Sequence, residues 1–376
     1  MQLLIFLIIL SFLIFIHEMG HFIMAKRAGV KVDEFGFGYP PKIGKFYTDK
    51  HGTEYTLNWL PFGGFVKLHG EEGQVDTEIS QAFYSKSKKK RLGIIVAGAV
   101  MNFLFGVVAF GAIYTKTGIP TNFDYVKIDQ VDIGSPAESS GLKTGNKVVA
   151  IINDSQEQKI SSIEEFKTHL EPNIGKEVTL IIEDGMEKKD VSVYVRNSEE
   201  IPEGKGAIGV TISDMDYIYY PMWQMPFRGI WLGLQTAVSF GIFLIVMLGN
   251  IFKDLFLSGT VPADIAGPVG IGHQVVKQSL LTNDLFSVQN FSFAAIISIN
   301  LAIMNMLPIP ALDGGRAIFL FIEKIVGRKK LEKIENKANS VGFILLLGLI
   351  ILISIRDVKT IFIDNGIAEW FNQLVK

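Results

Sequence analysis

Five stretches of this sequence reach or approach the ~20 apolar residues that a helix needs to cross the hydrocarbon core of a bilayer. They are residues 1–25, 92–115, 229–251, 291–312 and 341–355. The composition agrees, because 48% of the residues are hydrophobic and 20% are charged, whereas a soluble domain carries about 25% charged residues. We therefore expect an α-helical protein that crosses the membrane several times.

The first stretch has two interpretations, a cleaved signal peptide or a retained helix. Residues 1–16 are apolar apart from Gln2 and Ser11, and no basic segment precedes them. A signal peptide would also need a small-x-small cleavage site, and none follows before Lys26. We expect residues 1–25 to remain as the first transmembrane helix.

The charged residues and the cysteine count exclude several classes of function. The net charge is -2, from 36 basic and 38 acidic residues, so a nucleic-acid partner held by bulk positive charge is not expected. The sequence has no cysteine, which excludes disulfides, a thiolate nucleophile, cysteine zinc sites and iron–sulfur clusters. Any metal must therefore be bound by His, Asp or Glu.

Lysine and arginine predict the orientation in the membrane. Residues 26–91 contain 12 of them and residues 314–340 contain seven, so the positive-inside rule places both segments in the cytoplasm. If residues 229–251 also crossed the membrane, the second basic segment would face outside. The absence of charge between Arg228 and Lys253 favours a span. An interfacial or re-entrant helix is favoured instead by the number of spans, because only then do both basic segments lie on the same side of the membrane.

We therefore expect four spans, a cytoplasmic-side segment at 26–91 and a linker outside at 201–290 that contains the helix 229–251. The spans are expected at 1–25, 92–115, 291–313 and 341–356. A basic cytoplasmic loop at 314–340 follows the third span, and an extracytoplasmic amphipathic tail at 357–376 follows the fourth.

Two segments between the spans have strand-like patterns. Residues 122–200 are expected to form an extracytoplasmic α+β domain, with a capping box at 162–165 that opens a helix and strands at 177–183 and 189–195. Its segment 141–151 resembles a PDZ domain, and an unspecialised α+β domain is the alternative. In the other segment, residues 46–48, 55–60 and 65–68 predict a small β region, whose edge could bind an unwound peptide by strand addition or form a plain cytoplasmic hairpin.

The candidate chemistry begins with His17-Glu18-Met19-Gly20-His21, an H-E-x-x-H motif. Residues four apart share a helix face, so the two imidazoles can bind one Zn²⁺, and Glu18 can accept a proton from water. With 6 His in the chain, a random sequence would contain about 0.01 such matches. The motif continues an apolar helix, where ionisable residues indicate function; a pair of structural histidines is the alternative.

Catalytic zinc needs a third protein ligand, and Asp313 is the best candidate. Under the four-span topology it lies at the same membrane level as the histidines, after prolines that interrupt the third span. Such broken backbone is tolerated at membrane depth where it is buried in protein or lines a cavity. A capping or solvated turn aspartate is the alternative. Asn305 can bind a substrate carbonyl or bridge two helices.

The H-E-x-x-H motif, the sequence N-x-x-P-x-P-x-L-D-G at 305–314 and the PDZ-like insertion resemble the bacterial site-2 proteases of the regulator-of-sigma-E type. The resemblance implies an intramembrane zinc metalloprotease, with His17, His21 and Asp313 as Zn²⁺ ligands and Glu18 as the catalytic base. It also implies that residues 26–91 hold a membrane-associated β region. Arg316 stands where the family commonly has His.

The resemblance implies hydrolysis of peptide bonds within or near transmembrane segments, as in cleavage of an anti-sigma factor or a remnant signal peptide. The implied location is the bacterial inner membrane, with the active site near the cytoplasmic face and a site-1 protease acting upstream. The PDZ-like domain would filter substrates by size or dock a partner's tail. Two other functions remain open, a transporter with an intramembrane ion relay and a non-enzymatic PDZ scaffold.

Overall fold

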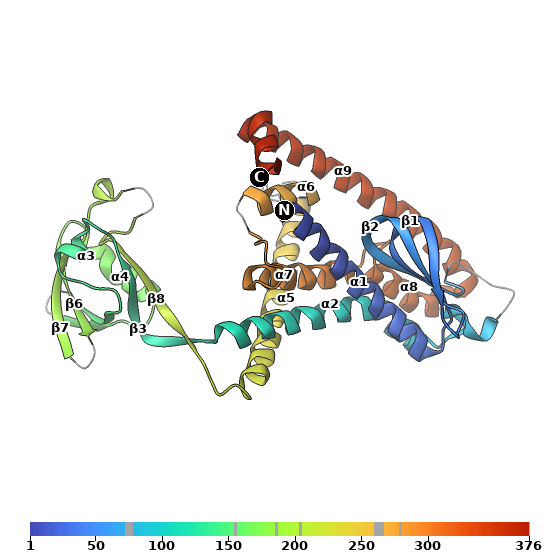
Figure 1. Cartoon of the computed structure of the whole chain (residues 1–376), viewed down its shortest axis with the longest axis horizontal. Coiled ribbons are helices and arrows are strands. Elements are labelled where there is room, and N and C mark those ends of the chain that lie inside the picture. The colour runs from blue at the N-terminus through green and yellow to red at the C-terminus, as the bar shows by residue number, and fades with distance from the viewer. Residues whose placement is uncertain are drawn as a thin grey trace. The chain divides into compact units, whose positions relative to one another are not determined.

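The computed structural model describes residues 1–71, 78–153, 156–184, 187–202, 205–258, 267–277 and 280–375 (Figure 1). They divide into two compact units. The helical unit consists of Met1–Lys116 and Pro226–Lys376, and the β unit consists of Thr117–Met225.

Long apolar helices make up most of the helical unit. Among the described residues, five helices contain a segment long and apolar enough to cross a membrane: α1 (Gln2–Ala28), α2 (Lys88–Thr117), α5 (Met225–Ser258), α7 (Val288–Asn305) and α9 (Arg328–Val375). The chain is thus a multi-pass membrane protein with a β domain. Because α5 meets the same criteria of length and composition, the number of spans stays a prediction.

The helix boundaries differ from the sequence-based expectation in the C-terminal third. The span expected at 291–313 ends at Asn305, because the proline-containing segment 306–312 cannot continue the helix. Residues 314–340, expected as a loop, are instead helical in α8 (Asp313–Val326) and the start of α9. The reason is that α8 has an apolar face, whose Ala317 and Leu320 pack into a core formed with α1 and α2.

The span expected at 341–356 and the tail expected at 357–376 belong to one helix, α9, which runs to Val375. The short helix α6 (Pro268–Lys277) lies against both α1 and α9.

Small residues allow α2 and α5 to approach closely, since a Cβ at Gly233 would lie only 2.5 Å from the carbonyl oxygen of Val107.

A small sheet packs on α1 within the helical unit. It consists of β1 (Val32–Thr48) and β2 (Glu54–Leu68), which pair antiparallel. Both strands fold back, so the register places four segments side by side in the order 64–68, 34–37, 54–58 and 42–48. The ring of Phe35 joins this sheet to α1, with ring centroids 5.5 Å from Phe15 and 4.9 Å from Phe22.

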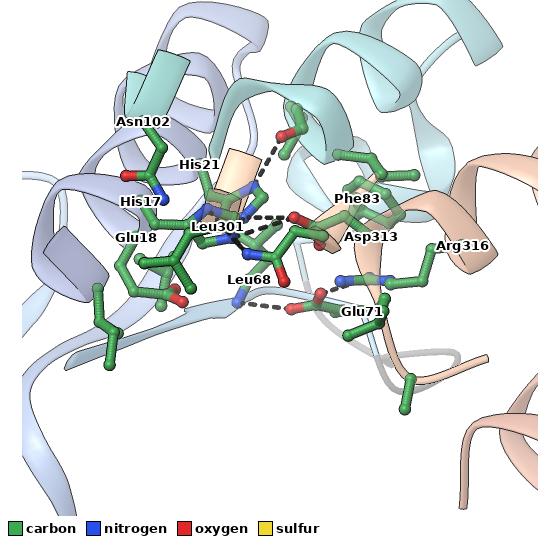
Figure 2. A pocket seen from close by; sticks show the side chains of 17 residues that line it. His17, Glu18, His21, Leu68, Glu71, Phe83, Asn102, Leu301, Asp313 and Arg316 are labelled. Carbon is green, nitrogen blue, oxygen red and sulfur yellow. Dashed lines mark hydrogen bonds and ion pairs between the residues drawn. The ribbon is translucent and has the colours of Figure 1, made fainter. Parts of the chain in front are cut away.

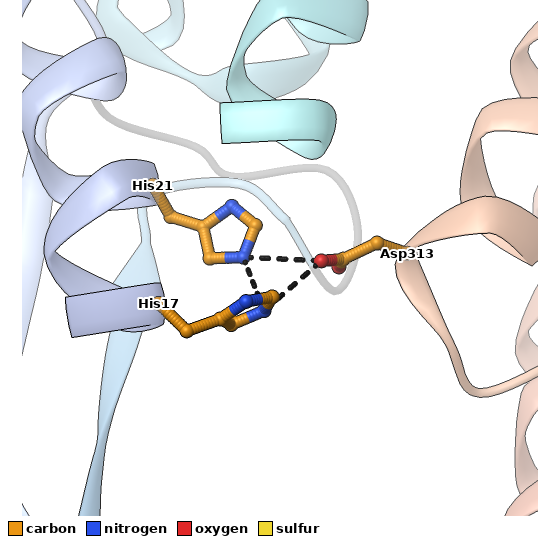
Figure 3. Close-up of side chains that lie close together, drawn as sticks. All are labelled: His17, His21 and Asp313. Carbon is orange, nitrogen blue, oxygen red and sulfur yellow. Dashed lines mark hydrogen bonds and ion pairs between the residues drawn. The ribbon is translucent and has the colours of Figure 1, made fainter. Parts of the chain in front are cut away.

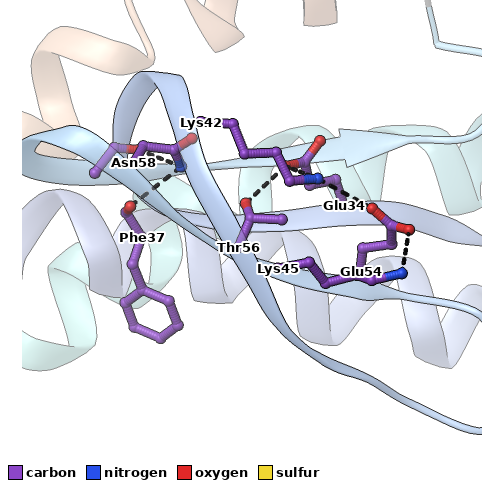
Figure 4. Close-up of polar contacts among 8 residues, drawn as sticks. Glu34, Phe37, Lys42, Lys45, Glu54, Thr56 and Asn58 are labelled. Atoms are coloured by element: carbon purple, nitrogen blue, oxygen red, sulfur yellow. Dashed lines mark hydrogen bonds and ion pairs between the residues drawn. The ribbon is translucent and has the colours of Figure 1, made fainter.

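Polar side chains fix the fold-back of this sheet (Figure 4). Lys42 and Lys45 donate hydrogen bonds to Glu54 at 3.1 and 3.0 Å, and Thr56 donates to Glu34 at 2.6 Å. The bonds from Lys45 and Lys42 lower the pKa of the Glu54 carboxyl, which keeps it charged. The outer segment 42–48 is therefore held against the inner segment 54–58, and the opposite edge is the segment 64–68.

The β unit is a sheet with the strand order β7-β6-β4-β3-β8, and β5 pairs with β4. The helices α3 (Pro136–Ser139) and α4 (Ile163–Leu170) belong to this unit, and its strands are β3 (Ile119–Val131), β4 (Lys147–Asn153), β5 (Gln156–Lys159), β6 (Glu177–Asp184), β7 (Glu187–Tyr194) and β8 (Val210–Ile218). Ser162 caps α4, as the sequence predicts, by accepting a hydrogen bond from the Glu165 backbone N–H at 3.2 Å.

The limits of this unit differ from the expected 122–200. Strand β8 lies in the segment expected as a linker, yet it pairs with β3 from Ile119↔Ile218 to Val131↔Val210. Its Val210 and Ile212 pack against the apolar core of the unit, so burial draws this strand into the sheet. The connection between the strands predicted at 177–183 and 189–195 lies partly outside the described residues.

A buried carboxylate joins α9 to α6. Asp357 is 6% exposed, and its Oδ2 accepts hydrogen bonds from the backbone N–H groups of Gly267 and Gly270, both at 2.9 Å. These are N–H groups at the start of α6, which have no partner within the helix. Asp357 thus caps α6 from a distant part of the chain.

We expect Asp357→Ala to destabilise the protein by about 1–2 kcal/mol, the usual cost of losing an N-cap. The measurement is the thermal unfolding midpoint in detergent micelles. Asp357→Asn is the matched control, because its amide oxygen still accepts a hydrogen bond, and it should lower the midpoint less. An alanine variant as stable as the wild type would show that this cap contributes nothing.

Candidate active site

Three side chains from distant parts of the chain converge at one point (Figure 3). His17 and His21 come from α1, and Asp313 is the first residue of α8. The Asp313 Oδ2 atom lies 3.1 Å from His17 Nε2 and 3.3 Å from His21 Nε2, and the two Nε2 atoms lie 3.2 Å apart. Among the described residues, this is the group of His, Asp and Glu side chains that could hold a metal ion.

The triangle formed by these atoms has the dimensions of a tetrahedral zinc site. With Zn–N and Zn–O bonds of about 2.0–2.1 Å, two ligands of a tetrahedral ion lie roughly 3.3 Å apart. The observed sides of 3.1–3.3 Å fit this value. Three protein ligands leave a fourth position open, as catalytic zinc sites require. The residues present therefore fit the metal.

The orientation of His21 is set by a backbone carbonyl. Its Nδ1 lies 2.8 Å from the carbonyl oxygen of Ile94 in α2. If Nδ1–H donates this bond, Nε2 carries the lone pair and faces His17 and Asp313. Hydrogen bonding of the second ring nitrogen fixes the tautomer in this way in most histidine metal sites.

Close backbone packing positions Asp313. The segment 306–312 folds back against the start of α8, where a Cβ at Gly314 would clash with the carbonyl oxygens of Met306 and Leu307. Ala311 has a positive φ of 76°, a strained conformation for a residue with a Cβ. Its backbone N–H donates to Asn339 Oδ1 at 3.1 Å. This tie to α9 stabilises the turn that delivers Asp313.

A cavity of about 350 Å³ surrounds these three side chains (Figure 2). Glu18 and Asn305 also line it, so the structure brings all five sequence-predicted site residues to one cavity. The side-chain nitrogen of Asn305 lies 3.4 Å from His17 Nδ1.

Sequence reasoning missed several polar residues of the cavity. Glu71, after β2, forms an ion pair with Arg316 of α8, and both line the cavity, as does Asn102 of α2. Asn102 could have been found, because a polar residue inside a stretch long enough to span a membrane often serves function. The Glu71–Arg316 pair has no sequence signal, since it joins two segments far apart in the chain.

Gly98 allows α2 to lie directly beside the histidines. A Cβ at this position would lie 2.5 Å from His21 Nε2 and 2.7 Å from His17 Nε2. Contacts that short do not occur with real Cβ atoms, so a methyl group here must displace an imidazole or the helix.

We expect Gly98→Ala to lower the bound metal at least about tenfold, because the methyl group occupies the space of the ligand atoms. Metal content of the purified protein is the measurement. Gly93→Ala is a matched control in the same helix, since a Cβ there meets only the flexible end of Met24 at 3.4 Å. Equal metal content in both variants would contradict the close approach of α2.

Comparisons with known proteins agree with this geometry. The model of Peptidase family M50 matches residues 5–349. A candidate zinc metalloprotease of Clostridium perfringens is 32% identical over 354 residues, which cover 94% of this chain and 97% of the relative. The zinc metalloproteases RasP of Geobacillus kaustophilus and Oceanobacillus iheyensis are each 27% identical, covering 95% of this chain and 98% and 99% of the relatives. The chain therefore belongs to Peptidase family M50.

Proposed function

We propose that this protein is an intramembrane zinc metalloendopeptidase of the site-2 protease type. It hydrolyses peptide bonds within or near transmembrane segments of other membrane proteins. The observation that carries the proposal is the 3.1–3.3 Å triangle of His17, His21 and Asp313 atoms beside Glu18. Two of the ligands and Glu18 lie in α1, a helix apolar enough to span a membrane, and the relatives named above are zinc metalloproteases.

His17, His21 and Asp313 would hold the zinc ion, and Glu18 and Asn305 have roles in the reaction. When bound, zinc polarises the scissile carbonyl and lowers the pKa of water toward neutral. The Glu18 carboxylate takes the proton of the attacking water and passes it to the leaving amine. The Asn305 amide donates a hydrogen bond to the carbonyl oxygen as negative charge develops on it.

A substrate helix must unwind before water can attack it, because its carbonyls are engaged in its own hydrogen bonds. The sheet edge at 64–68 is suited to hold the unwound segment by strand addition, since Val66 and Leu68 of this edge line the cavity. Large exposed apolar side chains, Tyr39, Phe46, Tyr47 and Trp59, cover other parts of the same sheet. They support its association with the membrane surface.

The proposal includes the four-span topology, with residues 26–91 and 314–340 in the cytoplasm and the β unit outside, in the inner membrane of a bacterium. In the view of Figure 1, α5 runs across α2 and α7 rather than along them. Exposed Phe227 and Trp231 lie at its beginning, where aromatic residues favour the membrane interface. The crossing supports an interfacial α5, and the two aromatic residues favour an interfacial position for its beginning.

The β unit acts on substrates as a PDZ-like domain. Its groove of about 270 Å³ lies between α4 and the edge strand β8, and Phe166, Leu170 and Ile212 line it. A groove between a helix and an edge strand is where PDZ domains add a peptide strand. This favours docking of a tail over a pure size filter. Tails left by a site-1 protease, such as those of an anti-sigma factor, or remnant signal peptides are the substrates that this arrangement fits.

We expect Glu18→Gln to keep zinc and to lower cleavage at least about 100-fold, the range lost with a general base. Cleavage of a model transmembrane substrate in detergent and zinc content are measured together. His21→Ala is the control that should lose both. A Glu18→Gln variant that cleaves like the wild type would remove Glu18 from the mechanism.

The topology can be tested by labelling single cysteines, because the natural sequence contains none. We expect Lys89→Cys and Gly327→Cys to react with an impermeant maleimide only from the cytoplasmic side, and Glu187→Cys only from outside. Met222→Cys and Lys253→Cys flank most of α5 and should both react from outside. Labelling of these two from opposite sides would show that α5 spans the membrane.

A further inference from the structure

Asn102 of α2 is a buried polar residue that the proposed mechanism does not use. Its side chain has 0% exposure and lines the cavity together with His17 and Glu18 (Figure 2). Neither its Oδ1 nor its Nδ2 has a hydrogen-bond partner among the described residues. The surrounding α2 segment is apolar enough to span a membrane, a position where a polar side chain is costly unless it has a function.

The backbone around Asn102 is satisfied, which isolates the side chain as the unpaired group. Asn102 lies within the α2 helix, and its backbone carbonyl oxygen also accepts a hydrogen bond from Ser298 Oγ of α7 at 2.8 Å. Buried polar groups are nearly always hydrogen-bonded, and an exception calls for an explanation. The Asn102 carboxamide has one acceptor oxygen and two donor hydrogens, and it lines a cavity. A ligand in the cavity that offers both a donor and an acceptor would explain why this side chain has no partner among the described residues.

We propose that the Asn102 side chain binds one peptide group of the unwound substrate, which rests on the proposed protease function. Its Oδ1 accepts the substrate N–H, and its Nδ2 donates to a substrate carbonyl. In Figure 2, Asn102 and Leu68 of the sheet edge lie on opposite sides of His17. The edge 64–68 therefore serves one side of an extended peptide, and Asn102 serves a peptide group beyond the metal ligands.

The first test compares Asn102→Ala with the wild type for cleavage of a model transmembrane peptide, zinc content and unfolding midpoint. We expect kcat/KM to fall about tenfold or more while zinc and midpoint are unchanged. Ser298→Ala is the matched control, because it removes the neighbouring hydrogen bond but leaves the amide in place, and it should cleave normally. Loss of zinc in Asn102→Ala would instead assign Asn102 a role in building the metal site.

The second test identifies the partner atom. Single backbone amides around the cleaved bond of the peptide are replaced by esters, which removes one N–H at a time. We expect one position where the ester weakens binding to the Glu18→Gln protein about tenfold, but has no further effect on the Glu18→Gln/Asn102→Ala protein. Full additivity at every position would overturn the proposal.

The two proposals fail in different ways. A wild-type protein that binds zinc but does not cleave the peptide would contradict the protease function. A wild-type protein that cleaves the peptide, together with an Asn102→Ala variant that cleaves equally well, would contradict only the role of Asn102.

Discussion

The approach of Asp313 to His17 and His21 is the contact on which the rest of this structure depends. The histidines lie on one rigid helix, whereas Asp313 must be brought there by α8. Two ion pairs tie α8 to the rest of the unit, Arg316 with Glu71 and Glu323 with Arg91. Apolar residues of α8 pack between them against α1 and α2. Because α8 is tied near its start and toward its end, the Asp313 carboxylate is held close to the two histidines.

The same arrangement also allows a reaction that needs water to take place among helices that are apolar enough to lie in lipid. Hydrolysis needs water, while α1 and α2 are apolar enough to lie in lipid. The cavity resolves the conflict by gathering polar groups around His17, His21 and Asp313, with Glu18, Asn305 and Asn102 on its walls. Ionisable groups at membrane depth are tolerated when they face such a cavity and one another. His17, His21 and Asp313 can therefore be shielded from lipid and still face a polar cavity.

Much of this could be predicted from the sequence, because the strongest signals are local. The spacing of His17 and His21 on a helix, and the prolines before Asp313, needed no tertiary information. Contacts between distant segments could not be predicted in the same way. The fold-back of β1 and β2 depends on side-chain pairs such as Lys45 with Glu54, and the helical state of residues 314–326 depends on burial of one face against α1 and α2. The fold-back leaves no periodic signal in the sequence. The segment 314–326 does have the amphipathic pattern of a helix, but the prediction of a loop gave its basic residues more weight.

In the proposed mechanism, the hydrogen bonds of an unwound substrate would link the sheet edge 64–68, the cluster of His17, His21 and Asp313, and Asn102. Opening one helical turn frees about four backbone N–H and four carbonyl groups, and each unpaired group is costly in an apolar surrounding. An antiparallel edge bonds to alternate residues of a peptide, so the five residues at 64–68 satisfy only part of this demand. The remaining peptide groups need side-chain partners on the far wall of the cavity. In the proposed mechanism, Asn305 would donate to the carbonyl that is attacked, and Asn102 would offer a donor and an acceptor to a neighbouring peptide group. Cleavage and unwinding would then be parts of one binding event.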